Sequence, residues 1–584
     1  MGPPNSLQDL GGDIAAAARS LADAAEAGLI PPDQELLPHL ARLAGKPAAE
    51  RNLSRALAAL GHRSQEADQE VNRAVLEHAR GLVLSDDADV AAPAMRALAG
   101  LSLNVRSNPL PFNMGILRSM QTLAQRSQSA KHLSSPVAFA LAHLAQDELF
   151  CLGFWQGMLE CAEAVVRWGD LQPGDCAWLA LGLSAVASGG PPRNQDPMDF
   201  VWDLLVILSA VLDASPQRGP GLDMVEVARH TGRALRHLVS LAADQRPPNL
   251  NGALLRAILR VKGLAPGDLE LQESVAFVLG NLSGSALPNS RQVRGMLLQS
   301  SLDLGRRMAG VPSIEVQVLR CAVGLARSSR QNSPRVNWIL LRQMLAAARH
   351  HADSEQVPSL ILFGLGQLAW NARGNSARMN RMIVQLLLRL AHRPPAGEHL
   401  HRLRTTVFAH LTLSYLANRR SLNAMLLRQL SLAIARAPDD VQVQQRAITG
   451  LANLCGAATR NCPRSNMALL QALSLQQAHH SPHFHSRRAF GLMLLADNAA
   501  ANSRRLNGLL AQHLVALATG PTITAEALGY VLRGMACLAY NAGSNPPALN
   551  GQLAQALNSM MGFFSADAAA QAELAGALDA LAAP

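Results

Sequence analysis

Four arginines occupy the same position in a pattern that repeats through the second half of the chain. Each stands two residues before a recurring asparagine, and they are Arg335, Arg378, Arg464 and Arg505. Guanidinium groups form charge-assisted, paired hydrogen bonds with carboxylates and phosphates. If every repeat places this loop at one edge, these arginines form a ladder for an acidic ligand. The alternative is a solvated edge that is basic without binding anything.

Further arginines lie close to these four: Arg330, Arg373, Arg420, Arg460 and Arg504. Residues 1–250 carry 20 basic and 27 acidic side chains, whereas residues 251–550 carry 32 and 12. A charge difference of this size between two segments indicates which segment attracts a charged partner, and it says little about the fold. We therefore expect the acidic-ligand site to lie in residues 251–550.

The recurring asparagine defines the repeat. It stands at Asn251, Asn337, Asn380, Asn423, Asn466, Asn507 and Asn550, with Arg294 in the same slot. Successive slots are 43 residues apart, except for one step of 41. A second asparagine stands five residues earlier: Asn289, Asn332, Asn375, Asn418, Asn461, Asn502 and Asn545. A fixed period of this length is typical of stacked structural repeats.

The residues between the asparagines predict two helices per repeat. Asn or Ser followed by Pro is typical of a helix start, because the side chain can accept hydrogen bonds from the unpaired backbone N–H groups there. After Asn423, the apolar residues Leu427, Leu430 and Ile434 fall on one helix face, and a second apolar face contains Ala447, Leu451 and Leu454. Neither helix can bury its apolar face alone. The sequence therefore predicts an all-α protein: a right-handed α-solenoid of about 12–13 helix-pair repeats with a 43-residue period.

Four segments are expected along the chain. Residues 1–12 form a flexible tail, in which Gly2 and Ser6 fit a loose N-myristoylation pattern. Residues 13–250 form irregular, acidic helical repeats. Residues 251–566 form regular, basic repeats, and residues 567–584 form an alanine-rich capping helix.

Sequence motifs for catalysis are missing. No phosphate-binding GxxxxGK[ST], GxSxG or HExxH occurs, so we expect no enzyme, no cofactor and no metal. His479, His480, His483 and His485 have the side chains to hold zinc, but no acidic or cysteine partner accompanies them. The cysteines are scattered and suit a reducing, cytoplasmic setting. No apolar run is long enough for a membrane span, so no stable membrane insertion is expected.

The repeat unit resembles those of armadillo and HEAT proteins. The resemblance rests on helix ends such as Leu279 to Ser283, Leu368 to Asn371 and Gly450 to Cys455, each followed by a loop rich in Asn and Pro. The unit length is also similar to that of SKWP-type repeats in type III effectors of plant-pathogenic bacteria, although no Ser-Lys-Trp-Pro sequence occurs here. This second resemblance implies a protein secreted into a host cell. A weaker similarity to octotricopeptide RNA-binding repeats concerns the helical pairs alone.

Two functions follow from these patterns. The first is a non-catalytic protein-interaction scaffold that binds an acidic or extended protein segment. The armadillo resemblance implies that asparagines hold the backbone of such a segment, with Asn281, Asn371 and Asn453 as candidates; helix capping or loop hydrogen bonding is the structural alternative. The second is RNA binding along the arginines. The few aromatic residues leave few stacking platforms for bases, which favours the scaffold.

Overall fold

The computed structural model describes all but a few short segments of the chain. The described residues are 13–126, 130–146, 152–169, 171–192, 195–215, 222–241, 246–285, 289–351, 354, 356–391, 398–474, 482–520 and 523–582. Every regular element in these ranges is a helix, so the all-α prediction is confirmed. The expected tail at residues 1–12, with Gly2 and Ser6, lies outside the described residues, as do His479 and His480.

The chain divides into two compact units, Met1–Cys321 and Ala322–Pro584, hereafter unit 1 and unit 2. The helices of unit 1 are α1 (Ile14–Glu26), α2 (Leu37–Leu43), α3 (Glu50–His62), α4 (Gln69–Leu82), α5 (Ala88–Ser102), α6 (Leu110–Arg126), α7 (Ser134–Leu144), α8 (Leu152–Trp168), α9 (Pro173–Gly189), α10 (Pro197–Ala214), α11 (Leu222–Leu238), α12 (Pro248–Leu264), α13 (Leu269–Gly284) and α14 (Arg291–Arg307). Short 3-10 turns are η2 (Gln34–Leu36), η3 (Pro47–Ala49) and η4 (Lys131–Leu133). Helix α15 (Pro312–Ala326) contains the boundary between the units.

Unit 2 contains most of the regular repeats, and α12 and α14 of unit 1 keep the same register. Its helices are α16 (Pro334–His350), α17 (Gln356–Trp370), α18 (Ala377–Ala391), α19 (Glu398–Leu411), α20 (Arg420–Arg436), α21 (Val441–Cys455), α22 (Pro463–Ser474), α23 (Pro482–Ala496), α24 (Arg504–Ala518), α25 (Ala525–Ala539), α26 (Pro547–Met560) and α27 (Ala568–Ala582), with 3-10 turns η5 (Thr412–Ser414), η6 (Ala542–Ser544) and η7 (Met561–Phe564). The recurring asparagine is the fourth residue of every even-numbered helix from α16 to α26. The 43-residue period is therefore one even-numbered and one odd-numbered helix with their loops.

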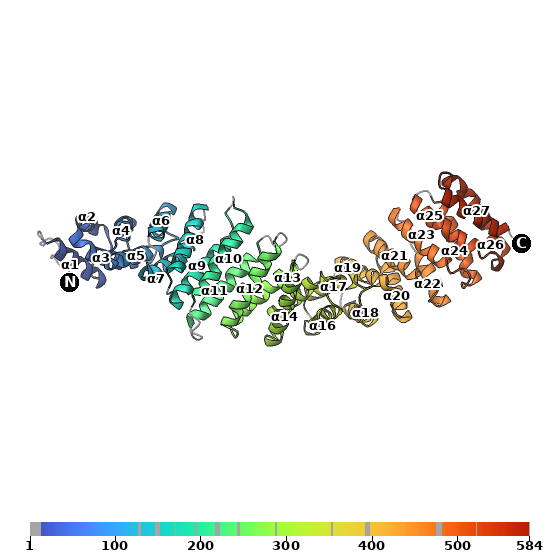
Figure 1. Cartoon of the computed structure of the whole chain (residues 1–584), viewed down its shortest axis with the longest axis horizontal. Coiled ribbons are helices and arrows are strands. Elements are labelled where there is room, and N and C mark those ends of the chain that lie inside the picture. Colours follow the sequence, from blue (N-terminus) through green and yellow to red (C-terminus); the bar gives the residue numbers. More distant parts are fainter. Residues whose placement is uncertain are drawn as a thin grey trace. The chain divides into compact units, whose positions relative to one another are not determined.

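Each unit is built as two rows of helices (Figure 1). Odd-numbered helices pack on odd-numbered neighbours, as α17 does on α19 and α19 on α21. Even-numbered helices pack on even-numbered neighbours, as α16 does on α18 and α22 on α24, and consecutive helices pack across the two rows. Stacking of this kind lets each repeat bury the apolar face of the next.

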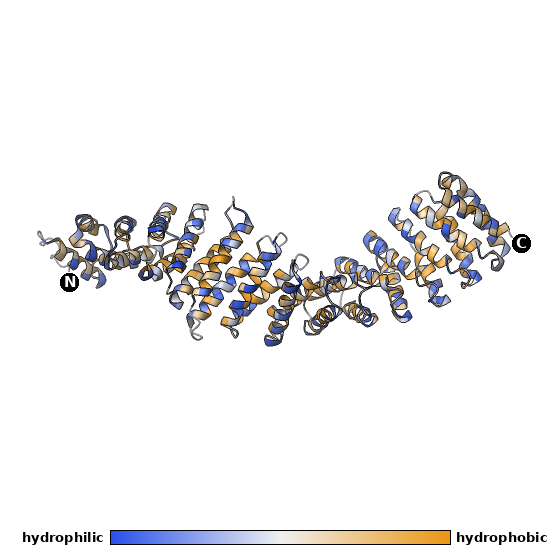
Figure 2. Cartoon of the chain, in the orientation of Figure 1, coloured by the Kyte–Doolittle hydropathy of each residue, from blue (hydrophilic) through white to orange (hydrophobic). Residues whose placement is uncertain are grey.

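The predicted core faces are confirmed in the repeat that begins at α20. Leu430 and Leu451 have no exposed surface, and Leu427, Ile434 and Ala447 are buried with them. Burying a leucine or isoleucine side chain stabilises the fold by about 1.5–3 kcal/mol. Figure 2 shows hydrophobic and hydrophilic residues on single helices throughout both units, as amphipathic helices in a two-row stack require.

The prediction that Asn or Ser accepts the first N–H groups of the following helix is confirmed for serine and wrong for asparagine. Ser333 Oγ accepts from the N–H of Val336 at 3.3 Å, and Ser503 Oγ accepts from Leu506 at 3.2 Å. The asparagine Nδ2 groups donate to backbone carbonyl oxygens earlier in the chain. Asn337 Nδ2 donates to the oxygen eight residues earlier, and Asn332 Nδ2 to the oxygen seven residues earlier, at 2.8 and 3.1 Å.

This backward pattern repeats along the chain. The fourth-residue asparagines Asn72, Asn113, Asn380, Asn423, Asn466, Asn507 and Asn550 all donate eight residues back. The earlier asparagines Asn108, Asn289, Asn375, Asn418, Asn502 and Asn545 donate seven residues back. The last carbonyls of a helix have no intrahelical partner. The asparagines therefore close the end of each odd-numbered helix and fix the turn into the next even-numbered helix.

Candidate interaction surface

Ten exposed arginines lie in unit 2 where an odd-numbered helix turns into the next even-numbered helix. They are Arg330, Arg335, Arg373, Arg378, Arg419, Arg420, Arg460, Arg464, Arg504 and Arg505, and we call this set the arginine edge. Because the turn recurs once per repeat, its side chains emerge at equivalent positions of stacked helices. Unit 2 as a whole has 24 basic and 10 acidic residues, so the edge belongs to a strongly positive segment.

The four arginines predicted from the sequence all occupy the second residue of a helix. Arg335 and Arg378 lie in α16 and α18, which pack on each other, and Arg464 and Arg505 lie in α22 and α24, which also pack on each other. The equivalent residue of α20 is Ser421. The four side chains therefore form two pairs, and Arg420 and Arg419 supply the charge in the repeat between them.

Among the described residues, no member of the arginine edge makes an ion pair with a carboxylate. In unit 1, by contrast, Arg55 pairs with Glu26 at 2.6 Å, and Arg229 pairs with Asp268 at 2.7 Å. A positive side chain in the first turn of a helix also opposes the helix dipole. Helix stability therefore does not explain why arginine recurs at this position.

Two edge arginines contact exposed or half-buried tryptophans. The Arg330 guanidinium lies 4.9 Å from the centre of the Trp370 ring, and the Arg378 guanidinium lies 5.5 Å from that of Trp338. Cation–π contacts hold a guanidinium while leaving its N–H edge available. Each pair joins neighbouring repeats. Sequence spacing does not reveal these tryptophans, because each occurs in a single repeat.

Two other edge arginines brace the turn itself. Arg373 Nε donates to the carbonyl oxygen of Leu413 at 3.2 Å, and a terminal nitrogen of Arg460 donates to that of Leu416 at 2.9 Å. Both bonds link one repeat to another. The arginine edge thus contains anchored members and members, such as Arg335 and Arg464, whose charge faces solvent.

Trp370 also contacts a histidine of the next odd-numbered helix. The ring centres of Trp370 and His410 are 4.7 Å apart and nearly perpendicular. Burial, followed by the nearby charges of Arg446 and Arg330, lowers the pKa of His410 to about 4. His410 is therefore neutral near pH 7, and the positive charge of this area comes from arginine.

The three asparagines proposed to hold a peptide occupy two different repeat positions. Asn281 and Asn453 stand eight residues before Asn289 and Asn461, whereas Asn371 stands four residues before Asn375. Their Nδ2 groups bond within the chain. Asn281 donates to Phe277 O at 3.1 Å, Asn371 to Ser329 O at 3.1 Å and Asn453 to Thr412 Oγ1 at 3.1 Å. The bonds of Asn371 and Asn453 reach the preceding repeat, whereas that of Asn281 stays within its own helix. All three side chains remain partly exposed.

The described part of the histidine cluster offers no metal site. His483 is exposed and His485 packs against the ring of Phe484, on α23. Across the described ranges, no three His, Cys, Asp or Glu side chains are close enough together to hold a metal ion. In the same ranges, no helix is both long and apolar enough to cross a membrane.

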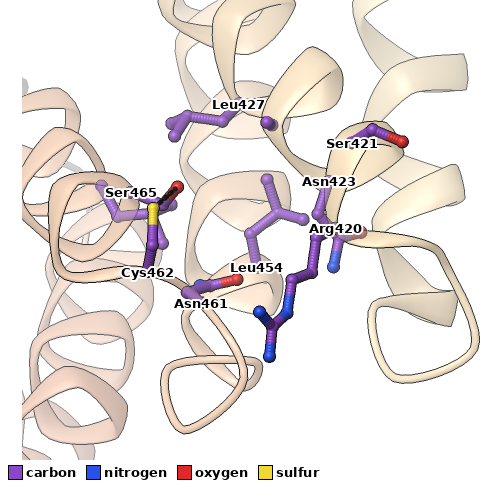
Figure 3. Close-up of a pocket in the computed structure, with 10 residues that line it drawn as sticks. Arg420, Ser421, Asn423, Leu427, Leu454, Asn461, Cys462 and Ser465 are labelled. Atoms are coloured by element: carbon purple, nitrogen blue, oxygen red, sulfur yellow. Dashed lines mark hydrogen bonds between the residues drawn. The ribbon is translucent and has the colours of Figure 1, made fainter. Parts of the chain in front are cut away.

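A cavity of about 230 Å³ opens beside the arginine edge, between α20 and α22 (Figure 3). Leu427, Leu454 and Leu469 form its apolar part. Arg420, Asn461 and Cys462 border it as well. This cavity could not be predicted from the sequence, because it depends on the local packing of two neighbouring repeats.

Solved structures with the same kind of architecture resemble this chain. A chain in a structure concerning the phosphorylation switch that controls the interaction between cadherin and beta-catenin aligns with a TM-score of 0.53, at 15% identity, over 85% of this chain and 99% of that chain. The fold is an armadillo-like α-solenoid. That confirms the predicted fold class.

Two further solved structures align with this chain at lower TM-scores. One is an engineered protein, with a TM-score of 0.35 and 16% identity over 87% of this chain and 99% of that chain. The other is a designed armadillo repeat protein, with a TM-score of 0.30 and 16% identity over 41% of this chain and 99% of that chain. No family model and no curated protein matches the sequence. In this armadillo-like solenoid, the arginine edge follows the turns between the two helix rows of unit 2.

Proposed function

We propose that this chain is a non-catalytic scaffold that binds an acidic, extended protein segment along the arginine edge. The observation that carries the proposal is the row of exposed arginines without carboxylate partners in the described residues. An ion-paired arginine has little charge left for a ligand, whereas an unpaired one attracts anions over a distance set by the ionic strength. Recurrence at one position per repeat suits an elongated ligand that meets several repeats in turn.

We propose a protein segment as the ligand because the arginine edge has many guanidinium groups and few aromatic rings on which bases could stack. Trp338 and Trp370 are the aromatic side chains in contact with edge arginines among the described residues, and Arg378 and Arg330 cover them. Single-stranded nucleic acid is usually held by bases stacked on aromatic rings as well as by backbone charge. Carboxylates need no such platform, and each can pair with one arginine fork.

The test compares two charge-matched variants of the full chain. In the edge variant, Arg335, Arg378, Arg464 and Arg505 become Gln; in the control variant, the exposed Arg342, Arg349, Arg389 and Arg428 become Gln. The control removes the same charge from the same unit, but away from the odd-to-even turns that carry the arginine edge. The probes are a polyglutamate peptide and an oligouridylate RNA of equal length, with binding measured by fluorescence anisotropy over a range of salt concentrations.

We expect the edge variant to bind polyglutamate far more weakly than the parent, and the control variant to bind it almost as well as the parent. If RNA is the ligand, the parent should bind oligouridylate more tightly than polyglutamate. In that case log affinity falls steeply with log salt, and each lost phosphate contact reduces the slope by roughly 0.7 to 1. Equal binding by the edge variant and the parent would reduce the edge to a solvated surface. The partly exposed asparagines Asn371 and Asn453 would then become the candidate contacts for a protein segment.

A further inference from the structure

Unit 1 has carboxylates at turn positions where unit 2 has arginine. Glu70 is the second residue of α4, the position that the four predicted arginines hold in their helices of unit 2. Asp68 directly precedes α4 and Asp196 directly precedes α10, as Arg419 directly precedes α20. Asp199 is the third residue of α10. We call this set the acidic edge: Asp68, Glu70, Asp196 and Asp199.

The carboxylates of the acidic edge are available to a partner. All four residues are exposed. Among the described residues, none of them makes an ion pair with a basic side chain, whereas the neighbouring Glu66 pairs with Arg63 at 3.0 Å. Asp196 accepts from the N–H of Met198 at 2.7 Å, but a carboxylate has room for several hydrogen bonds. Arg106 is exposed in the turn into α6, and the set together with this arginine remains net negative.

The acidic and basic positions have the same spacing in repeats. In unit 1, α4, α6, α8 and α10 pack on one another in that order, so the two acidic turns are three repeat steps apart. In unit 2, three steps also separate Arg335 from Arg464, and Arg378 from Arg505. Stacked helices of one kind keep similar distances from their neighbours. A contact that pairs the first acidic turn with an arginine therefore brings the second acidic turn near another arginine.

We propose that the chain self-associates, with the acidic edge of one copy bound to the arginine edge of a second copy. The inference rests on the proposed function in one respect, which is that the arginine edge attracts carboxylates. Exposed ion pairs are individually weak and are screened by salt. The association is therefore reversible and sensitive to salt, and an acidic protein segment competes with the second copy for the same arginines.

The test measures the mass of the full chain by sedimentation and light scattering, over a range of protein concentrations at low and at high salt. The acidic-edge variant carries Asp68→Asn, Glu70→Gln, Asp196→Asn and Asp199→Asn. Asparagine at position 196 keeps an oxygen that accepts from the N–H of Met198. The control neutralises four exposed carboxylates of unit 1 outside the odd-to-even turns: Glu77→Gln, Glu160→Gln, Asp203→Asn and Asp223→Asn.

We expect the mass of the parent to rise with concentration at low salt and to return to that of one chain at high salt. The acidic-edge variant and the edge variant should each self-associate about tenfold more weakly or worse, because each loses several ion pairs at once. The control should associate like the parent. An equal mixture of the acidic-edge variant and the edge variant should associate more strongly than either alone, since one supplies the arginines and the other the carboxylates.

Polyglutamate separates this inference from the proposed function. The acidic-edge variant keeps its arginine edge, so it should bind polyglutamate at least as well as the parent, and polyglutamate should dissociate the parent assembly. A parent that stays a single chain at every concentration overturns the inference, as does an acidic-edge variant that associates like the parent or a mixture that associates no better than its components. Each of these results leaves the binding of polyglutamate to the arginine edge to be decided by its own measurement.

Discussion

Asn337, in α16, and Asn371, the first residue after α17, donate to the same carbonyl oxygen. Both Nδ2 groups reach Ser329 O, at 2.8 and 3.1 Å. The arrangement recurs at Ala458 O, which accepts from Asn466 and Asn498, and at Ala499 O, which accepts from Asn507 and Asn541. One bond closes the turn within a repeat, and the other ties that turn to the next repeat. The shared oxygen therefore couples local turn geometry to repeat stacking.

The first prediction is that Asn337 and Asn371 are energetically coupled. Asn337 has no exposed surface, so Asn337→Ala should destabilise unit 2 by about 1 to 2 kcal/mol. Asn371 is half-buried, and Asn371→Ala should cost less. In either single variant the remaining asparagine still satisfies Ser329 O, whereas the double variant leaves it unpaired. We expect the double variant to lose at least about 0.5 kcal/mol more than the sum of the singles.

Urea unfolding of the full chain, followed by circular dichroism, measures this coupling as a shift of the transition midpoint. Additive shifts would contradict it. They would show that the two bonds stabilise the turn and the stack separately.

The sequence predicted the helices of unit 2 well because two independent patterns agree there. The apolar spacing of Leu427, Leu430 and Ile434 marks a buried helix face, and the 43-residue asparagine period marks where each such helix starts. The direction of the asparagine hydrogen bonds could not be predicted. Asparagine carries both a donor and an acceptor, and only the folded turn brings a carbonyl seven or eight residues back within reach.

The contacts of the candidate surface depend on which helices of neighbouring repeats pack together. The 43-residue sequence period alone does not show which helices these are. Arg378 and Trp338 lie in different repeats and meet because α16 packs on α18. The asparagine pattern also does not include Arg246, which stands five residues before Asn251, in the slot that asparagine fills in later repeats. Its Nε donates to Asn251 Oδ1 at 3.0 Å. A different residue type can therefore do the same work at an equivalent position.

The second prediction concerns two glycines that let α3 and α5 approach closely. A Cβ at Gly100 would stand 2.3 Å from the backbone carbon of Gly61, and a Cβ at Gly61 would stand 2.5 Å from Ala97 O. Backbone cannot move aside as a flexible side chain does. Gly100→Ala should therefore destabilise unit 1 by about 1–3 kcal/mol through overpacking.

The matched control for this substitution is Gly295→Ala in α14. A Cβ there meets nothing within 4 Å, and alanine is favoured over glycine in a helix interior by about 1 kcal/mol. The melting temperature should therefore fall in Gly100→Ala and rise in Gly295→Ala. A stable Gly100→Ala protein would mean that α3 and α5 do not pack this closely.

The third prediction concerns pH. Burial holds the pKa of His410 at about 4 in the folded chain, below its ordinary value of 6.5. The unfolded chain therefore takes up this proton first as the pH falls. The stabilising contribution of neutral His410 is complete above about pH 6.5 and is lost progressively between pH 6.5 and 4. His410→Gln should make the melting temperature of unit 2 less sensitive to pH across that window.

His483→Gln is the control, because His483 is exposed on α23. Melting temperatures between pH 4 and 7.5 are compared for the parent and both variants. An unchanged pH profile in His410→Gln would show that His410 is solvated in the folded chain. Its packing against Trp370 would then have no part in the acid response.

The last prediction separates binding from stability at the arginine edge. Arg335, Arg378, Arg464 and Arg505 each stand in the first turn of a helix, where a positive charge is unfavourable by about 0.3–1 kcal/mol at low ionic strength. Replacing all four by Gln should therefore leave the melting temperature unchanged or raise it at low salt. Added salt should remove any gain, because exposed charges are screened. A melting temperature that falls in the quadruple variant would show that these arginines hold the turns in place. Weaker ligand binding by that variant would then reflect a damaged surface, whereas with an intact melting temperature it identifies the guanidinium groups as the ligand contacts.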